Sequence, residues 1–195
     1  MAIEIEETLQ VEAPIERVWE FVMDPKRVVN CMPGAALEEV VDERNFVGKV
    51  KVKVGAISAS YKGKVEFTEV DPAARTVRMT AAGRETGGGT AKGTIDMALA
   101  TLDSGPTELS ITAKIDLTGR IMQVGRGMIQ GVSHQLFKQF AASVKGILET
   151  EGEESKAVEA AVAEQQELAV LPLIFSTIWA AVVDFVKRLF GRSTD

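Results

Sequence analysis

Six strand-like segments follow one another between residues 36 and 117, and this run constrains the fold more than any other feature. Each segment is rich in apolar or alternating residues, and a short turn with Gly, Pro, Asp or Asn separates it from the next. Connections this short join neighbouring antiparallel strands, so the run predicts an antiparallel meander. The predicted strands are residues 36–41, 46–54, 57–70, 75–82, 90–102 and 108–117.

Helical segments flank this run on both sides. A strand at residues 3–11 comes first, followed by a helix that Pro14 opens and a second short helix at residues 26–30. After the meander, residues 119–148 predict one long helix with an apolar face. This order is typical of an α+β architecture in which a curved antiparallel sheet wraps around a long C-terminal helix.

A strongly curved sheet cannot touch a straight helix along its whole length, so the sequence also predicts an apolar ligand cavity between them. Glycines in the first half of the long helix favour open volume there, although they are also compatible with a close approach of helix and sheet. The residues predicted to line the cavity are Trp19, Met32, Val52, Tyr61, Phe67, Met79, Met97, Ile121, Met122, Gly125, Met128, Ile129 and Val132.

The net charge of −6 is concentrated in one short segment. Residues 1–148 carry 18 basic and 19 acidic side chains, whereas residues 149–167 carry seven Glu and one Lys. We therefore predict a nearly neutral domain at 1–148, an acidic flexible linker at 149–167 and a membrane-associating helix at 168–192. A neutral domain has no basic surplus for the phosphate backbone, so binding of nucleic acid is not expected.

The tail is apolar and amphipathic. Residues 168–183 contain no charged side chain, and on a helical wheel the later charged residues gather on one narrow side. A spanning helix needs about 20 apolar residues, so a helix lying in the membrane surface is favoured. A span and docking into a protein groove are the alternatives. The predicted membrane residues are Leu171, Phe175, Ile178, Trp179, Val182, Phe185, Lys187, Arg188 and Phe190.

The N-terminus and the cysteine content indicate a compartment. Cys31 is the only cysteine, so an intrachain disulfide is impossible and a reducing interior is expected. The first eleven residues alternate acidic and apolar side chains and lack the features of a signal peptide. We expect a peripheral protein at the cytoplasmic face of the cell membrane.

Residue types that carry catalysis are scarce, with one His, one Cys and one Tyr. A reactive Cys–His pair would need the two side chains within hydrogen-bond distance of each other. His134 is instead predicted at the helix surface, and Cys31 is predicted as a small buried side chain. The glycines of residues 87–89 lie between two strands, which predicts a hairpin or a close backbone approach rather than a phosphate loop. No metal-ligand cluster is evident. The sequence therefore favours a non-enzyme without a metal.

Lysines alternate with valines in one strand, so Lys49, Lys51 and Lys53 share one face of the sheet. Lys62 and Lys64 join them if the next hairpin is in register. Such a stripe is usually a solvated face, and it is also a candidate surface for an acidic partner or lipid head groups.

Several short motifs, taken together, resemble one known family. The motifs are Ala13-Pro14, Val18-Trp19, Asp24-Pro25, Cys31-Met32-Pro33-Gly34, the Gly-Lys-Val stretch at 48–55, Tyr61-Lys62-Gly63, Asp71-Pro72, residues 119–125 and residues 137–140. Over residues 2–148 the chain resembles the START-like, or polyketide cyclase, superfamily and, within it, the CoxG family of carbon monoxide dehydrogenase subunits. The resemblance implies a helix-grip fold and a subunit without molybdenum, flavin or iron–sulfur centres.

The resemblance also implies a partner, a molybdenum hydroxylase similar to carbon monoxide dehydrogenase, met near its flavin subunit. With the cavity and the tail, it leads us to expect a non-catalytic membrane-recruitment subunit that binds an apolar ligand, such as an isoprenoid respiratory quinone, and passes it to the enzyme. The alternatives are a structural anchor or maturation factor without ligand, and a small cyclase or hydrolase for an apolar substrate.

Overall fold

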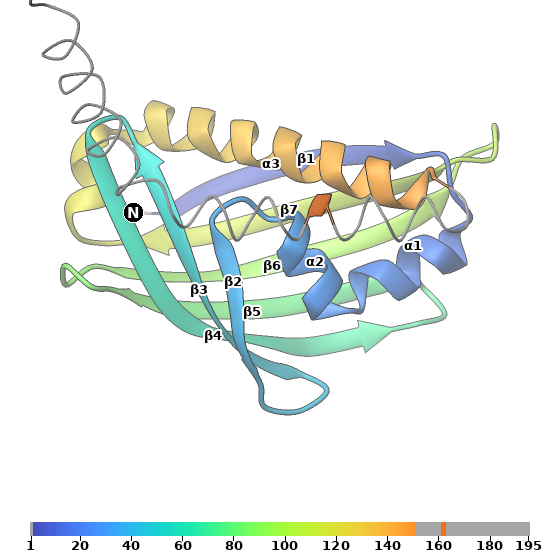
Figure 1. The fold of residues 1–195 in the computed structure, drawn as a ribbon, viewed down its shortest axis with the longest axis horizontal. Helices are drawn as coiled ribbons and strands as arrows, with labels where there is room; N and C mark the ends of the chain where they lie inside the picture. The colour runs from blue at the N-terminus through green and yellow to red at the C-terminus, as the bar shows by residue number, and fades with distance from the viewer. Residues whose placement is uncertain (1, 151–160, 163–195) are drawn as a thin grey trace, which may run out of the picture.

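The computed structural model describes residues 2–150 and 161–162 of the chain. They form a seven-stranded antiparallel sheet of order β1-β7-β6-β5-β4-β3-β2, a meander whose first strand lies beside the last (Figure 1). The strands are β1 (Ala2–Val11), β2 (Ala35–Val40), β3 (Asn45–Val54), β4 (Ile57–Asp71), β5 (Thr76–Glu85), β6 (Thr90–Thr101) and β7 (Thr107–Leu117). The helices are α1 (Ile15–Val22), α2 (Pro25–Cys31), the 3-10 helix η1 (Arg120–Val124) and α3 (Arg126–Leu148).

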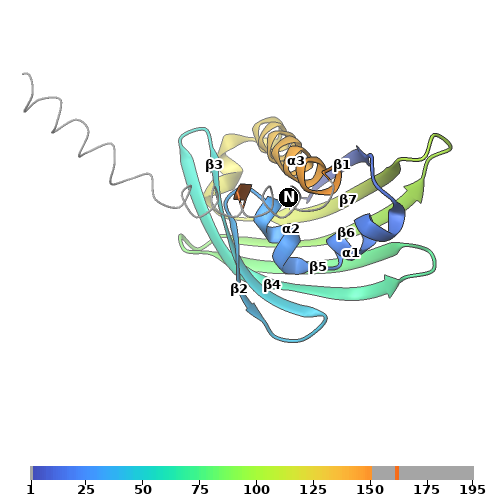
Figure 2. The ribbon, with the colours of Figure 1, turned by 45° about the vertical axis from the view of Figure 1, so that its right-hand side comes forward.

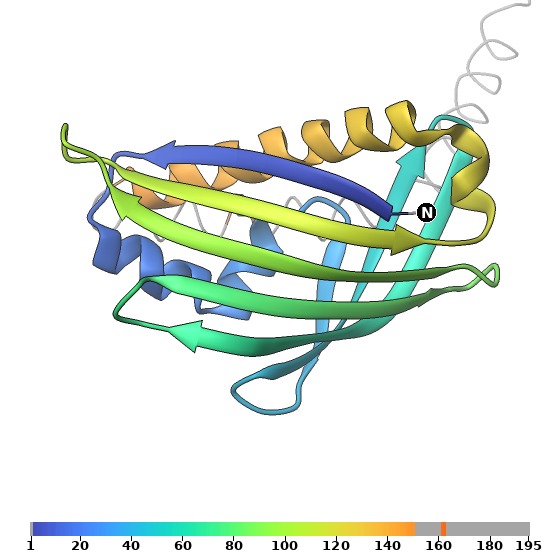
Figure 3. The same cartoon turned by 180° about the vertical axis from the view of Figure 1, so that it is seen from behind.

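The sheet is strongly curved, and the helices lie in its concave side (Figure 2). Strand register places alternate residues on the two faces, so Leu9, Leu109 and Leu99 form one buried cross-strand row on the concave side. The opposite, convex face seen in Figure 3 is polar, as the Glu4–Lys114 ion pair between β1 and β7 illustrates. The predicted α+β architecture of a curved sheet around a C-terminal helix is confirmed.

Three glycines form one row across three neighbouring strands. Gly48, Gly63 and Gly83 pair with one another across β3, β4 and β5. A Cβ on Gly63 would lie 2.3 Å from the carbonyl oxygen of Ala82 and 2.6 Å from the Cα of Gly83, so only glycine permits this approach of β4 and β5. β3 and the first part of β4 turn away from the other strands (Figures 1 and 3).

The main core fills the concave side on one flank of this glycine row. It joins α1, α2 and the second half of α3 to the sheet, with Val18, Phe21, Val144 and Ile147 fully buried. Asp24 caps the start of α2 by accepting hydrogen bonds from the backbone N–H groups of Lys26 and Arg27.

The single long helix predicted for residues 119–148 is wrong. Gly125 has a φ of 82°, outside the helical region, and it divides the segment into η1 and α3. The buried face of α3 contains Ile129, Val144 and Ile147, as the periodicity predicted, whereas Gly125 is exposed.

The end of α3 is attached to the start of α1. Arg17 donates to the carbonyl oxygen of Thr150 at 2.8 Å, and the side chain of Glu149 accepts from the backbone of Glu12 at 3.0 Å. Val162, in the middle of the predicted linker, is partly buried and packs against the main core. The boundaries predicted at 148 and 167 stay predictions, because 151–160 and 163–195 lie outside the described residues.

The predicted membrane helix, with all its contact residues from Leu171 to Phe190, also lies outside the described residues. Within the part of the chain that the structure describes, no helix has the length and apolarity needed to cross a membrane. The surface helix therefore stays a prediction.

Candidate functional site

A second apolar cluster lies apart from the main core, around Tyr61 of β4. We call it the Tyr61 cluster. Ile121 of η1 lies over it and is buried, so this short helix covers the cluster. Its buried members are Val54, Ala59, Tyr61 and Ile121, and its partly buried members are Val50, Val52, Ile57, Ala91, Leu117, Met122, Val124 and Val132.

A carboxylate is buried beside this cluster. Glu85 pairs across the strands with Tyr61, and its side chain is only 1% exposed. Its Oε1 accepts a hydrogen bond at 3.0 Å from Nη2 of Arg120, the first residue of η1. Its Oε2 has no hydrogen-bond partner among the described residues. The ion pair therefore fixes the start of η1 to the sheet while one carboxylate oxygen stays unpaired.

The glycine-rich turn between β5 and β6 encloses this carboxylate. A Cβ on Gly87 would lie 2.6 Å from Nη2 of Arg120, and a Cβ on Gly89 would lie 2.8 Å from Oε2 of Glu85. The turn joins two strands, as predicted for a hairpin, and its glycines permit a close approach of the backbone to the Glu85–Arg120 pair.

Tyr61 adds a second unpaired polar group. Its hydroxyl is buried without a hydrogen-bond partner in the described part of the chain. Desolvation by burial raises the pKa of Tyr61 above its ordinary value of 10.0, and the nearby charge of Glu85 raises the pKa further. At neutral pH the residue is therefore a phenol that can donate or accept one hydrogen bond.

The pKa of Tyr61 can be measured directly, because Tyr61 is the only tyrosine of the chain. A spectrophotometric titration of the tyrosinate absorbance should give a midpoint above the ordinary value of 10.0. In Glu85→Gln the midpoint should fall but stay above that ordinary value, because burial is the larger cause. A wild-type midpoint at the ordinary value would contradict the buried setting of the hydroxyl.

The structure divides the predicted cavity residues between the two clusters. Tyr61, Val52, Ile121, Met122 and Val132 meet in the Tyr61 cluster. The others that lie inside belong elsewhere: Trp19, Phe67, Met79 and Met97 pack in or against the main core, and Ile129 is buried on α3.

Three residues predicted to line the cavity lie at the surface instead. Met32 and Met128 are 44% and 49% exposed, and Gly125 is exposed at the junction of η1 and α3. A Cβ built on Gly125, Gly127 or Gly131 would meet no atom within 4 Å. These glycines face outward, so they do not supply volume between helix and sheet as we expected.

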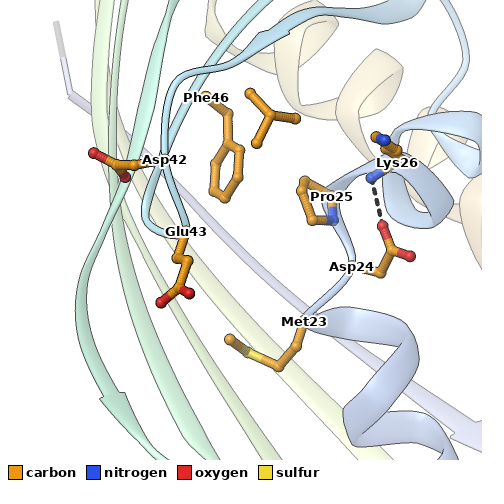
Figure 4. A pocket seen from close by; sticks show the side chains of 8 residues that line it. Met23, Asp24, Pro25, Lys26, Asp42, Glu43 and Phe46 are labelled. Atoms are coloured by element: carbon orange, nitrogen blue, oxygen red, sulfur yellow. Dashed lines mark hydrogen bonds between the residues drawn. The ribbon is translucent and has the colours of Figure 1, made fainter.

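Two grooves on the described surface contain none of the predicted ligand residues. The first, of about 360 Å³, lies between the α1–α2 junction and the β2–β3 hairpin, where Met23, Asp24 and Pro25 face Glu43 and Phe46 (Figure 4). The second, of about 400 Å³, is on the convex face between β5, β6 and β7.

Glu85 is absent from the residues predicted for the site. The glycines of residues 83–89 predict a loop in the sequence, whereas β5 continues through Gly83 and ends at Glu85. Alternation along β5 is the signal that could have found it.

Three further polar side chains that could act on a substrate, Arg78, Arg84 and His134, do not converge on the Tyr61 cluster. Arg78 forms ion pairs with Asp96 and Glu69 on the convex face, and its hydrogen bond to Asp96 is the main cause that raises the pKa of Arg78. Nδ1 of His134 lies 2.7 Å from Oε1 of Glu7, with the His134 side chain 55% exposed. Arg84 is exposed, on the face opposite to that of Glu85.

The lysine stripe is formed as predicted. Lys49 is paired with Lys62 across β3 and β4, so the hairpin is in register and the stripe lies on the convex face. Glu38 of β2 lies 2.5 Å from Nζ of Lys62 and 3.7 Å from Nζ of Lys49. No ion pair is found for Lys51 or Lys53 within the described residues, and both are exposed.

The described part of the chain offers no metal site, and its cysteine is buried. It contains no group of three or more His, Cys, Asp and Glu side chains placed to hold a metal ion. Cys31 is buried in the main core, as predicted for a small apolar side chain.

Comparison with solved structures gives the fold. A conserved protein from Geobacillus kaustophilus aligns with a TM-score of 0.64 and 19% identity, over 83% of this chain and 96% of that protein. The Zhui aromatase/cyclase from a Streptomyces species aligns with a TM-score of 0.52 and 17% identity, over 83% and 94%. A START superfamily protein from Mycobacterium smegmatis aligns at 0.50 with 15% identity, over 75% and 97%. The fold is therefore START-like.

Sequence comparison gives the family. Among curated proteins no match was found. The profile of one family, the CoxG subunit of carbon monoxide dehydrogenase, matches residues 8–148, which is most of the chain and nearly all of the curved sheet with its helices. The chain therefore belongs to the CoxG family of carbon monoxide dehydrogenase subunits.

Proposed function

We propose that this protein recruits a molybdenum hydroxylase of the carbon monoxide dehydrogenase kind to the cytoplasmic face of the membrane and carries an apolar ligand, a respiratory quinone, to it. The family and the START-like fold support a ligand-binding protein that accompanies a carbon monoxide dehydrogenase. To this we add the proposals that the protein binds the enzyme near its flavin subunit and that the ligand is a quinone.

One observation carries the ligand-binding part of this proposal. The concave face does not close into a single core, because the Tyr61 cluster lies apart from the main core, under η1. Gly119 and Gly125, with φ angles of 89° and 82°, bound η1 at its two ends. Release of the Arg120–Glu85 ion pair together with backbone rotation at these glycines can therefore move the cover without disturbing α3 or β7. The cluster is a binding region that can open.

The ligand chemistry follows from the residues around Tyr61. Nearly all of the cluster is aliphatic, which suits a flat apolar ring or an isoprenoid chain and offers no group that would bind a charged substrate. A quinone combines such a body with a small polar head, and it is the redox molecule that a membrane holds. We therefore propose an isoprenoid quinone as the non-covalent cofactor.

Native mass spectrometry with organic extraction, on the full chain purified from its own membranes, tests ligand carriage. We expect one bound isoprenoid quinone, and we expect Val132→Trp to reduce its occupancy by about tenfold by filling the cluster. Gln135→Trp, on the exposed side of α3, is the matched control and should keep the ligand. A chain that holds no quinone and takes up none when quinone is added would leave only a structural anchor.

The lysine stripe is the proposed docking surface for the enzyme. In Lys51→Glu/Lys53→Glu, binding of the hydroxylase should weaken by about tenfold, mainly through slower association, and its dependence on salt should become shallower. Surface plasmon resonance over a range of ionic strength measures both effects. Lys26→Glu/Lys138→Glu, exposed on α2 and α3, changes the net charge by the same amount and is the control. Equal effects of both variants would assign the loss to net charge rather than to this surface.

A further inference from the structure

Two buried polar atoms lack hydrogen-bond partners among the described residues, and they belong to paired residues on neighbouring strands. They are the hydroxyl of Tyr61 and Oε2 of Glu85. A buried polar group left unpaired destabilises the folded state, and folded proteins pair nearly all such groups with protein, ordered water or ligand. Because Tyr61 and Glu85 are direct cross-strand partners, one further molecule could pair with both groups.

The two groups have complementary hydrogen-bonding abilities. The Tyr61 hydroxyl is able to donate or accept. Arg120 occupies Oε1 of Glu85, so its Oε2 remains as an acceptor with no donor within the described residues. Together the groups suit a ligand head that presents one hydroxyl donor and one further polar oxygen.

The surroundings restrict the ligand to one with an apolar body. The side chains around Tyr61 are aliphatic, and Ile121 of η1 closes the region from above. The exposed guanidinium of Arg120 is already used by Glu85. The polar pair is therefore a small hydrophilic end of an apolar site, which η1 must uncover for a ligand to enter.

We propose that Tyr61 and Glu85 form the head-group site for the carried quinone and that this site favours the reduced form, the quinol. This inference rests on the proposed function. A quinol hydroxyl donates to Oε2 of Glu85, whereas a quinone carbonyl only accepts and is repelled by a carboxylate. Tyr61 donates to the carbonyl of the oxidised form or accepts from the reduced form, so it serves both.

This preference has a consequence for electron transfer. A site that binds the quinol more tightly makes the bound couple easier to reduce than the free couple, by thermodynamic linkage. The carrier therefore promotes removal of the reduced product from the enzyme. Glu85 acts here through binding alone, and the structure assigns it no bond-making step.

Anaerobic isothermal titration calorimetry of the full chain tests the inference, with decyl-benzoquinone and its chemically reduced quinol as probes. The wild-type chain should bind the quinol about tenfold more tightly than the quinone. In Glu85→Gln, the amide accepts from Arg120 through its oxygen and donates to a carbonyl through its nitrogen, so the preference should reverse. Tyr61→Phe should weaken the binding of both quinone and quinol by about fivefold. The control Glu66→Gln, on the convex face of β4, should change neither.

Failure of the head-group site is distinguishable from failure of the proposed function. If the wild-type chain binds both forms and Glu85→Gln leaves their ratio unchanged, quinone carriage stands and the head-group site is wrong. If the wild-type chain binds neither form, quinone carriage itself is wrong.

Thermal unfolding of the ligand-free variants supplies a readout that needs no ligand. Tyr61→Phe removes an unpaired buried hydroxyl, so it should be as stable as the wild-type chain or more stable. A clear loss of stability would show that the hydroxyl holds a structural water, and it would overturn the assignment of Tyr61 to the ligand.

Discussion

Gly63→Ala is expected to destabilise the folded chain by about 3 kcal/mol, because the new methyl group would overlap the backbone of the neighbouring strand. Its Cβ would lie 2.3 Å from a carbonyl oxygen and 2.6 Å from a Cα, both on backbone that the β4–β5 hydrogen bonds hold in place. Urea unfolding followed by circular dichroism measures the change as a lower midpoint at constant slope.

Gly83→Ala provides the matched control, since Gly83 is the cross-strand partner of Gly63. A Cβ at Gly83 would meet its nearest atom, the carbonyl oxygen of Lys62, at 3.4 Å, which is ordinary contact. We expect a change below about 1 kcal/mol. Equal losses of unfolding free energy in the two variants would show that steric overlap at Gly63 does not cause the destabilisation.

The contrast matters for function because the glycine row lies beside the candidate site. Tyr61 and Glu85 lie two residues before Gly63 and two residues after Gly83, on the concave side of the sheet. A methyl group at Gly63 would push the β4 and β5 backbones apart next to both residues. The same substitution that destabilises the fold should therefore also weaken ligand binding.

The arrangement of strands could be predicted from the sequence because it depends on local signals. Turn residues at short intervals fix the order of an antiparallel meander, and alternation fixes which face each residue occupies. The lysine stripe follows from this alternation alone, and the register of Lys49 with Lys62 confirms it. These signals lie within a few residues of the features they determine.

The interrupted helix could not be predicted in the same way. Apolar periodicity continues through Gly125, and glycine adopts helical and positive φ values about equally well, so the sequence does not reveal the break. Glu85 escapes prediction for a related reason. Gly83 resembles the end of a strand, although continued alternation from Met79 through Gly83 places Glu85 on the inner face.

The candidate site could be predicted only in part, since an apolar pattern gives the face of a residue and not its position along the concave side. Tyr61, Val52 and Ile121 meet in one cluster, but Phe67 and Met97, which share the inner face, pack in the main core. The row of Gly48, Gly63 and Gly83 lies between the two groups along the strands. Its position depends on pairing between three strands, which no local pattern reports.

Removal of residues 168–195 is expected to weaken binding to vesicles that contain anionic lipid by at least about 100-fold. The deleted segment includes Phe175, Ile178 and Trp179, and burying even two large apolar side chains is worth about 3 kcal/mol. Co-sedimentation with vesicles measures the loss. The truncated chain keeps the sheet, η1 and α3, so its unfolding midpoint is the control for intact folding.

A charge reversal separates a surface helix from a spanning one. In Lys187→Glu/Arg188→Glu, vesicle binding should fall by about tenfold and lose its dependence on anionic lipid, because each cation near such a surface contributes about 1 kcal/mol. A spanning segment would instead keep both the wild-type chain and the charge-reversed variant in the membrane during alkaline extraction. If the truncated chain still binds vesicles, the lysine stripe of β3 becomes the membrane contact, and Lys51→Glu/Lys53→Glu in that background should remove the binding.

The truncation also separates ligand binding from ligand delivery. All members named for the Tyr61 cluster, and the Tyr61–Glu85 pair, lie between residues 50 and 132, so the truncated chain should bind decyl-benzoquinone from solution with unchanged affinity. It should fail to extract long-chain quinone from vesicles, because extraction needs residence at the surface where the quinone is held. Loss of both abilities would mean that the tail contributes to the ligand site itself, and unimpaired extraction would mean that quinone reaches η1 without membrane attachment.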